Sequence, residues 1–282
     1  MMRELRGMPV VKAMTAKLSE DVKTLAQRGI TPTLAIVRVG ARPDDLSYER
    51  GATKRFASVG AAVKVLELPG DCTQEQLEAT VRGANEDTGV HGILIFRPLP
   101  RHLSEEPLKA LIAPEKDVDC FGNAGYASLF IGAKEAFPPC TPQAVVELID
   151  HYGIELTGKK VTIVGRSLVV GKPLMVMLLA KNATVKVCHT KTADLAAECR
   201  DADVLIAAAG VAKMIKADFV RPGQTVIDVG INMDGDTLCG DVDAEAVGSI
   251  VDALTPVPGG VGTITTAVLC KHTVMNAVRS AK

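Results

Sequence analysis

Apolar residues recur along the chain in two alternating patterns, one helical and one extended. Val11, Leu18 and Leu25 belong to a series spaced by three and four residues, which predicts an amphipathic helix over residues 9–28. An almost uninterrupted apolar run follows at 33–40 and predicts a buried strand. The chain therefore begins as a helix followed by a buried strand.

The same alternation continues through the first half of the chain. Further strands are predicted at 63–69 and 92–96. Between them, Thr73 and Gln76 have the spacing of a capping box, which predicts a helix that ends near Asn85. Strands and helices that alternate at roughly thirty-residue intervals are typical of parallel β-α-β units.

A second set of strands follows a helix predicted over 141–152. The last segment, 266–281, again has helical spacing and is expected to pack back on the first half. We therefore predict an α/β protein of two domains flanking a cleft, with boundaries at 1–140 plus 264–282 and at 141–263. The strands of the second domain are predicted at 160–165, 184–188, 203–208 and 225–229.

Composition favours a small-molecule partner. The 282 residues include 32 basic and 33 acidic side chains, so a net charge of −1 provides no field to attract nucleic acid or an anionic membrane. The chain contains no run of about 18 apolar residues, so no membrane span is predicted. Seven scattered cysteines without a C-x-x-C pair are typical of reduced thiols in a cytoplasmic protein, and we expect neither disulfides nor a metal site.

The segment 161–174 has the pattern of a nucleotide-binding turn. An apolar strand leads into a turn with Gly165 and Gly171, and a helix is predicted to begin near Pro173. Such a turn lets backbone N–H groups and a helix N-terminus face a pyrophosphate. The spacing differs from the common G-x-G-x-x-G, so an ordinary strand-to-helix turn remains the alternative.

The next predicted strand indicates which nucleotide is bound. An NAD enzyme carries an acid after this strand, but here the strand ends in His189, Thr190 and Lys191. Arg166 lies in the phosphate turn itself, and cationic and hydroxyl donors suit a 2′-phosphate. The sequence therefore favours NADP, and NAD remains the alternative because Asp194 lies nearby.

The chain resembles the methylenetetrahydrofolate dehydrogenase/cyclohydrolases, the bifunctional FolD proteins, over nearly its whole length. The rigid, glycine-rich stretch at 255–266 and the acidic turn at 114–122 contain two of the motifs that this family shares. The motifs stand in the family's order: KDVD (116–119), PCTP (139–142), VGRSLVVGKP (164–173), CHTKT (188–192), VIDVGIN (226–232), GDV (240–242) and PVPGGVG (256–262).

The resemblance implies an N-terminal α/β folate-binding domain, a Rossmann-type NADP-binding domain, a homodimer joined through the latter, and a role in one-carbon metabolism. It assigns catalysis and folate binding to Tyr48 and Asp119, with Tyr48 facing the folate ring and Asp119 hydrogen-bonding the pterin. The other positions that it assigns are Phe96, Pro258, Gly259 and Gly260 for folate and Gly165, Arg166, Ser167, Thr190 and Ile231 for the cofactor.

Two positions depart from the family pattern together. The family has a lysine four residues after the catalytic tyrosine, where this chain has Ala52. Lys54 is no direct substitute, because four helical residues turn by about 40° net and six by about 240°. The family's VQLPLP reads IFRPLP at 95–100, so Phe96 replaces the glutamine that hydrogen-bonds the lysine.

These changes do not affect the two family reactions equally. Oxidation of 5,10-methylenetetrahydrofolate transfers a hydride and needs the two rings in place, whereas hydrolysis of the methenyl product needs proton transfers. We therefore predict a dehydrogenase with weak or absent cyclohydrolase. The alternatives are a bifunctional enzyme that uses a displaced Lys54 or Arg55, an NADP dehydrogenase of another small substrate, and a catalytically silent sensor of folate or nucleotide.

Overall fold

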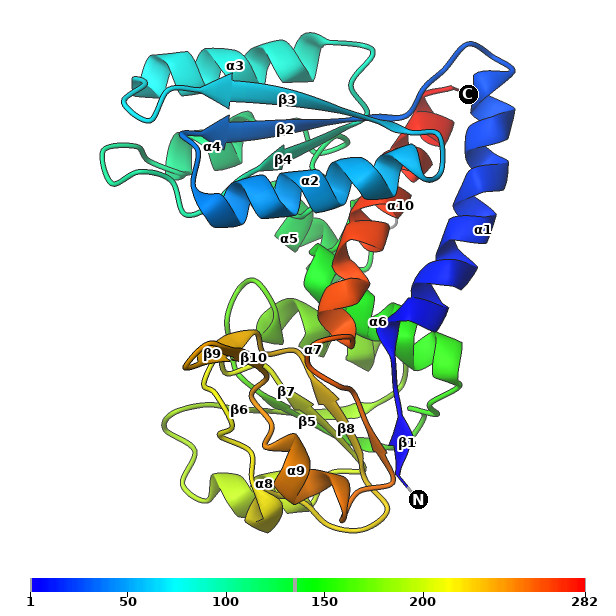
Figure 1. The fold of residues 1–282 in the computed structure, drawn as a ribbon, viewed down its shortest axis with the longest axis vertical. Helices are drawn as coiled ribbons and strands as arrows, with labels where there is room; N and C mark the ends of the chain where they lie inside the picture. The colour runs from blue at the N-terminus through cyan, green and yellow to red at the C-terminus, as the bar shows by residue number, and fades with distance from the viewer. Residues whose placement is uncertain (1, 134–135, 282) are drawn as a thin grey trace. The chain divides into compact units, whose positions relative to one another are not determined.

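The computed structural model describes residues 2–133 and 136–281, and the chain divides into two compact units (Figure 1). The first unit contains residues 13–140 and 266–281, and the second contains residues 2–12 and 141–265. The division falls within helix α1 (Gly7–Ala26) and at the beginning of helix α10 (Thr265–Ser280). Each unit is therefore built from two separate stretches of the chain.

The first twelve residues differ from the predicted division. Strand β1 (Arg3–Glu4) pairs in parallel with β11 (Ala253–Leu254), so this segment belongs to the second unit instead of the first. The N–H of Leu5 extends the pairing by donating to the carbonyl of Leu254 at 2.8 Å. Two charged residues have no apolar periodicity, and the pattern of hydrophobic positions therefore gives no signal for β1.

The first unit is built on a three-stranded parallel sheet with β2 in the middle, as Figure 1 shows. Each strand agrees with a predicted one to within a residue or two, and the capping box of Thr73 and Gln76 is present. The strands are β2 (Thr33–Val39), β3 (Ala62–Leu68) and β4 (Gly92–Ile95), and the other helices are α2 (Pro43–Ala57), α3 (Gln74–Glu86), α4 (Glu106–Leu111) and α5 (Asn123–Ile131).

Strand β2 is buried on both faces, which explains its almost unbroken apolar sequence. Ala35, Val37 and Val39 point to a core that they share with α3 and α4. Leu34 and Ile36 point to the opposite face and are also buried. Burial on both faces fixes the register of β2, and with it the place where β2 ends and α2 begins.

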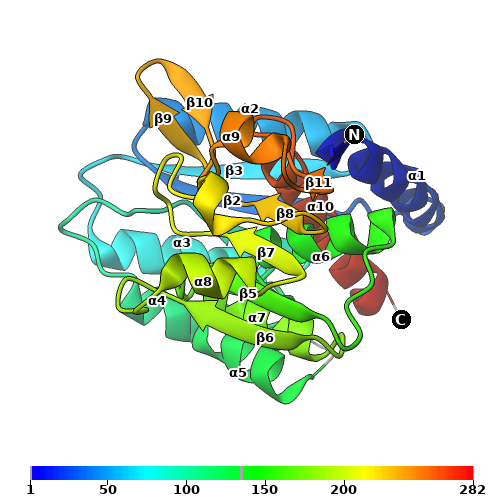
Figure 2. The same cartoon turned by 90° about the horizontal axis from the view of Figure 1, so that it is seen from below.

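The second unit is built on a six-stranded parallel sheet, and the order from β8 through β7 and β5 to β6 can be followed in Figure 2. The full order is β1-β11-β8-β7-β5-β6, with β5 (Lys160–Val164), β6 (Thr184–Cys188), β7 (Val204–Ala207) and β8 (Thr225–Asp228). The remaining elements are α6 (Cys140–Tyr152), α7 (Gly171–Leu179), α8 (Leu195–Arg200), α9 (Ala244–Gly248), the hairpin of β9 (Asn232–Asp234) and β10 (Thr237–Cys239), and 3-10 turns at Ala217–Phe219 and Val261–Thr263.

The strand order of the second unit contains a switch point at β5. The chain passes from β5 to its neighbour β6 on one side, and then crosses back to β7 on the other side. In doubly wound sheets, ligands bind at the carboxyl ends of the strands where the order reverses. The fold therefore places a binding position directly after β5 and β7.

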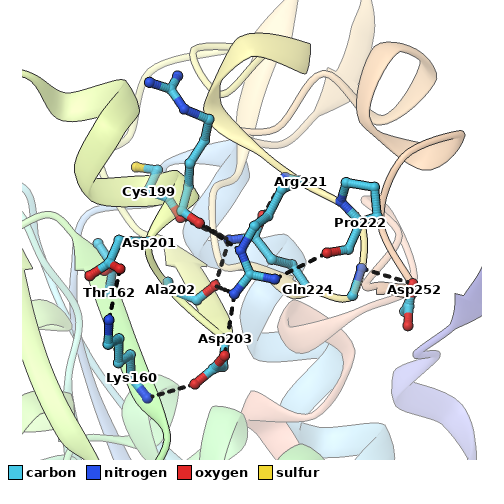
Figure 3. A network of polar contacts seen from close by, with 12 residues as sticks. Lys160, Thr162, Cys199, Asp201, Ala202, Asp203, Arg221, Pro222, Gln224 and Asp252 are labelled. Carbon is cyan, nitrogen blue, oxygen red and sulfur yellow. Dashed lines mark hydrogen bonds and ion pairs between the residues drawn. The ribbon is translucent and has the colours of Figure 1, made fainter.

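The amino ends of the same strands are joined by a polar network (Figure 3). The side chain of Arg221 donates to the carbonyls of Arg200 and Ala202 and to the carboxylate of Asp203. Gln224 donates to the carbonyls of Cys199 and Ala202 at 2.8 and 2.7 Å. These bonds satisfy the backbone groups between α8 and β7. The network therefore lies at the end of the sheet opposite to the binding position at the carboxyl ends of the strands.

All seven cysteines are free and buried, and the thiol of Cys140 donates to the carbonyl of Val118 at 3.4 Å. Within the described ranges 2–133 and 136–281, no helix is both long enough and apolar enough to span a membrane.

Candidate functional site

Helix α2 presents Tyr48 and Ala52 on one face. Positions 48, 52 and 55 are separated by four and three residues, so they form one stripe along the helix. Ala52 is completely buried, with 0% of its surface exposed, whereas Lys54 is exposed. The helix is continuous through Gly51. Lys54 therefore points away from the face that carries Tyr48.

A buried ion pair holds α2 against the sheet next to Tyr48. Arg38, near the end of β2, donates through Nε to the carboxylate of Glu49 at 2.8 Å. Only 5% of the Arg38 side chain is exposed. A buried guanidinium that lost this partner would keep its desolvation cost, so the pair strongly favours one rotation of α2.

Tyr48 packs against Phe96 at the end of β4. The two ring centroids are 5.7 Å apart and the rings are nearly perpendicular. Phe96 is buried, and its N–H donates to the carbonyl of Val37 at 3.0 Å. The position that the family resemblance assigns to a glutamine is thus part of an aromatic pair, and such edge-to-face contacts contribute about 0.5–1.5 kcal/mol beyond burial.

Asp119 and Cys140 lie beside this pair. The N–H of Cys140 donates to Oδ1 of Asp119 at 2.8 Å. Desolvation raises the pKa of Asp119, and the hydrogen bond from Cys140 and the positive charge of Arg97 oppose that rise. About a third of the surface of Tyr48 is exposed (37%), but desolvation and the nearby Cys140 and Asp119 raise the pKa of its hydroxyl.

Asp117 has a structural role in the same turn. Its two carboxylate oxygens accept from the N–H groups of Phe121 and Gly122, each at 2.8 Å. Burial raises the pKa of Asp117 to about 6. The two aspartates of the KDVD motif therefore differ, because the N–H groups of the turn hold Asp117, whereas Cys140 holds Asp119.

A hollow of about 250 Å³ lies at the switch point of the second unit. Gly165 follows β5 with a φ of +128°, and a Cβ there would lie 2.1 Å from the carbonyl oxygen of Ala208. A Cβ at Gly171 would lie 2.0 Å from the carbonyl oxygen of Gly165. The G-x5-G spacing is therefore required by close packing of the turn. The residues that line the hollow include Gly165, Arg166, Ser167, His189, Thr190, Ala208 and Ala209.

The donors around this hollow suit a phosphorylated ribose. None of the residues lining it is acidic. The nearby acid, Asp194, accepts from the N–H of Ala197 at 2.9 Å and so caps α8. Nδ1 of His189 accepts from the N–H of Lys191 at 3.1 Å, which leaves the Nε2 side of the ring as a donor. Arg166 and His189 thus provide donors where an NAD enzyme has an acceptor.

A second hollow of about 230 Å³ lies in the same unit, and it brings Ile231 together with Pro258, Gly259 and Gly260. The carbonyl of Gly259 accepts from the N–H of Gly7 at 2.8 Å, which ties this loop to the beginning of α1. The structure therefore gathers the predicted site residues in three groups: Tyr48, Phe96 and Asp119 in the first unit, and the linings of the two hollows in the second.

Two buried aspartates that support these hollows were not among the predicted residues. Asp241 accepts from the N–H groups of Ala209, Gly210 and Val211, and Asp228 accepts from those of Gly230, Asp241 and Val242. Burial raises the pKa of Asp228 to about 6. Asp228 stands in the motif at 226–232 and Asp241 in the motif at 240–242, and an aspartate within two residues of a glycine was the only available signal.

Comparison with known proteins identifies the same two parts of the chain. Residues 5–119 match the family described as "Tetrahydrofolate dehydrogenase/cyclohydrolase, catalytic domain", and residues 139–281 match its "NAD(P)-binding domain". The bifunctional protein FolD of Clostridioides difficile is 54% identical over 271 residues, which cover 96% of this chain and 94% of that protein.

Solved structures agree over the whole chain. The bifunctional FolD of Campylobacter jejuni has a TM-score of 0.96 at 38% identity, with 99% of each chain covered. The Trypanosoma brucei N5,N10-methylenetetrahydrofolate dehydrogenase-cyclohydrolase, solved in complex with NADP cofactor and an inhibitor, has a TM-score of 0.93 at 34% identity, covering 100% of this chain and 99% of that one.

Proposed function

Because the chain belongs to the tetrahydrofolate dehydrogenase/cyclohydrolase family, we propose that it oxidises 5,10-methylenetetrahydrofolate to 5,10-methenyltetrahydrofolate with NADP. The observation that carries the proposal is the hollow after β5 and β7, whose glycine turn and donors fit a phosphorylated dinucleotide. Both matched domain descriptions name tetrahydrofolate, so a dehydrogenase of another small substrate is not favoured.

The residues of the second unit fit NADP better than NAD. When bound, NADP supplies the nicotinamide that accepts the hydride. In our proposal Gly165, Arg166 and Ser167 hold the phosphates, while Thr190 and His189 bind the adenosine ribose and its 2′-phosphate. Capping by Asp194 supports this assignment, since its Oδ1 is used by α8.

The residues of the first unit would hold the folate. We assign Tyr48 to the folate ring and Asp119 to hydrogen bonds with the pterin. Pro258, Gly259 and Gly260, which the family resemblance assigns to folate, line the hollow of the second unit together with Ile231, which we assign to the cofactor. A nitrogen lone pair of the substrate assists departure of the hydride, so no side chain has to remove a proton. The protein's contribution to this step is the placement of the rings.

We propose that the cyclohydrolase step is weak or absent. That step adds water and opens a ring, and it therefore depends on a group that exchanges protons near neutral pH. The α2 face offers none next to Tyr48, because Ala52 is apolar and the raised pKa keeps the Tyr48 hydroxyl protonated. Phe96 packs on Tyr48 where a polar partner of a lysine would be needed.

The two displaced cations considered from the sequence do not replace the lysine. Lys54 is exposed on another side of α2. Arg55 lies on the Tyr48 face one turn beyond Ala52 and is half-buried, with a buried Nε that has no hydrogen-bond partner among the described residues. A guanidinium stays protonated at neutral pH, so Arg55 supplies charge but no general base.

Paired assays on one preparation test both parts of the proposal. We expect reduction of NADP with 5,10-methylenetetrahydrofolate, a lower rate with NAD, and hydrolysis of the methenyl product close to its spontaneous rate. Absence of NADP reduction would overturn the dehydrogenase and favour a silent sensor. Enzymatic hydrolysis well above the spontaneous rate would overturn the loss of the cyclohydrolase.

Restoring the missing pair should restore hydrolysis. The double substitution Ala52→Lys with Phe96→Gln places a lysine one turn from Tyr48 and gives it a partner, and we expect hydrolysis at least about tenfold faster than in the parent. Ala52→Lys alone should gain less, because the buried ammonium then faces Phe96 without a hydrogen bond. No gain in the double variant, with dehydrogenase activity retained, would contradict the assignment of position 52.

We further propose a homodimer and a cytoplasmic location. Exposed apolar side chains on the second unit support an interface there, among them Leu179 and Met233. Seven free thiols are typical of a reducing compartment. Light scattering coupled to gel filtration tests the first proposal, which a monomer at micromolar concentration would exclude, and cell fractionation tests the second.

A further inference from the structure

Arg97 directly follows Phe96 at the carboxyl end of β4, and its place in the first unit is fixed from several sides. Nη2 of Arg42 donates to the carbonyl of Arg97 at 3.1 Å. Arg42 is itself held by two hydrogen bonds to Asp45, each 2.8 Å long. The backbone of Arg97 is thus anchored to the first turn of α2, the helix that carries Tyr48.

The side chain of Arg97 is positioned by an aromatic ring. Its guanidinium carbon lies 5.2 Å from the ring centroid of Phe121, which is a cation–π distance. Phe121 is buried, and its N–H is held by Asp117. A guanidinium over a fixed ring retains its N–H groups at the edge, where they remain able to donate.

The donors of Arg97 are not used within the protein. Across residues 2–133 and 136–281, its guanidinium makes no hydrogen bond and no ion pair. The charge nevertheless acts on the folate-binding position proposed above, because it lowers the pKa of Asp119 and that of Tyr126, opposing in each case a larger rise from desolvation. A half-buried cation with five unused donors therefore lies near Asp119.

The sequence places this cation where the family stretch VQLPLP has a leucine. The same protein has Ala52 where the family has a lysine. One positive charge is absent from the α2 face, and one is present at the end of β4. Compared with the family stretch, this positive charge therefore lies near Asp119 instead of one turn from Tyr48 on α2.

We infer that Arg97 is a substrate-binding residue whose guanidinium donates to the ring oxygen of the pterin, beside the ring N–H groups that Asp119 accepts. This inference rests on the proposed function. A carboxylate only accepts and a guanidinium only donates, so the pair matches the edge of a pterin, where a carbonyl oxygen adjoins an N–H and an amino group. Arg97 then orients the ring for hydride transfer without exchanging a proton.

The experiment compares Arg97→Leu and Arg97→Lys with a matched control, Arg101→Leu. Arg101 is exposed in the same loop, and its charge is not among the causes that shift the pKa of Asp119. We expect Arg97→Leu to raise KM for 5,10-methylenetetrahydrofolate, and the Kd for tetrahydrofolate measured by titration calorimetry, about tenfold or more, while KM for NADP stays unchanged. Arg97→Lys should lose less, because it keeps the charge but not the planar fork.

A second substrate tests whether Arg97 binds the ring oxygen or the carboxylates of the glutamate tail. With the pteroate analogues, which lack glutamate, Arg97→Leu should cause the same fold loss. If the loss disappears with these analogues, Arg97 serves the tail carboxylates and the inference is wrong. It is also wrong if Arg97→Leu behaves like Arg101→Leu in the Kd measurement. That measurement needs no turnover, so failure of the wild-type protein to reduce NADP would refute the proposed function separately.

Discussion

At the scale of single residues, the environment of Tyr48 decides which chemistry it can support. Its ring packs edge-on against Phe96, and its hydroxyl has a raised pKa. A ring that is held in place but does not release its proton can position a flat substrate and is a poor general base. The structure thus separates the two properties that a tyrosine can contribute to an active site.

This separation predicts different results for two substitutions. Tyr48→Phe keeps the ring and its contact with Phe96, and we expect dehydrogenase kcat/KM to stay within about threefold of the parent value. Tyr48→Ala removes the ring, and we expect kcat/KM to fall about tenfold or more. Steady-state kinetics with saturating NADP gives both numbers. Equal losses in the two variants would mean that the hydroxyl, instead of the ring, is what the dehydrogenase uses.

At the scale of elements, the sequence predicted those whose burial is nearly complete. Strands β2, β5 and β7 are buried along most of their length, and the resulting apolar runs were readable. The hairpin β9–β10 and strand β1 were not predicted, because each strand has only two or three residues and exposes most of them. Short exposed strands are specified by their partners and not by their own sequence.

The site residues divide in the same way, into those with a signal in the local sequence and those without one. Gly165 and Arg166 were predicted as cofactor-binding residues because a glycine turn after a strand is a local pattern. Asp228 and Asp241 were missed, since their partners are backbone N–H groups up to 32 residues away, which leave no mark in the local sequence. Arg97 was not singled out from the sequence, because its relation to Phe121 depends on how the chain folds.

Two glycines in different elements predict opposite effects of the same substitution. Gly171→Ala puts a Cβ 2.0 Å from the carbonyl oxygen of Gly165, far inside van der Waals contact, so the turn must move, and we expect KM for NADP to rise about tenfold or more. Gly51→Ala meets no atom within 4 Å inside α2 and should stabilise the protein by about 0.5–1 kcal/mol. Kinetics and urea unfolding distinguish them, and an unchanged KM in Gly171→Ala would contradict the tight turn.

At the scale of the whole molecule, the parallel sheet of the second unit has loops and hollows at the carboxyl ends of its strands and a polar network at their amino ends. In the second unit, Asp228 and Asp241 hold the loops at the carboxyl edge, while Arg221 and Gln224 tie the amino edge (Figure 3). The carboxyl edge depends on buried acids and the amino edge on an arginine and an amide. The stability of the loops around the hollows should therefore respond to pH.

The raised pKa of Asp228 gives the direction in which the stability changes with pH. Its pKa is about 6 in the folded protein and about 3.9 when unfolded, so between these values the folded state binds more protons. The resulting stabilisation is complete below pH 4 and is lost as the pH rises through 6, by up to about 3 kcal/mol. Asp228→Asn should remove this part of the slope of unfolding free energy against pH, while the exposed control Asp236→Asn should keep it. Identical slopes in the parent and Asp228→Asn would refute the assignment.

The pairing of β1 with β11 has a consequence for how the protein is made. The second unit needs residues 3–5 together with 253–254, and the first unit needs α10, where Asn276 donates to the carbonyl of His91 and the ring of His272 meets the carbonyl of Val118. A ribosome releases the chain from its N-terminus onward. Residues 3–5 leave the ribosome long before β11 and α10 do, so we expect neither unit to complete its fold until the segments around residues 254 and 276 have emerged.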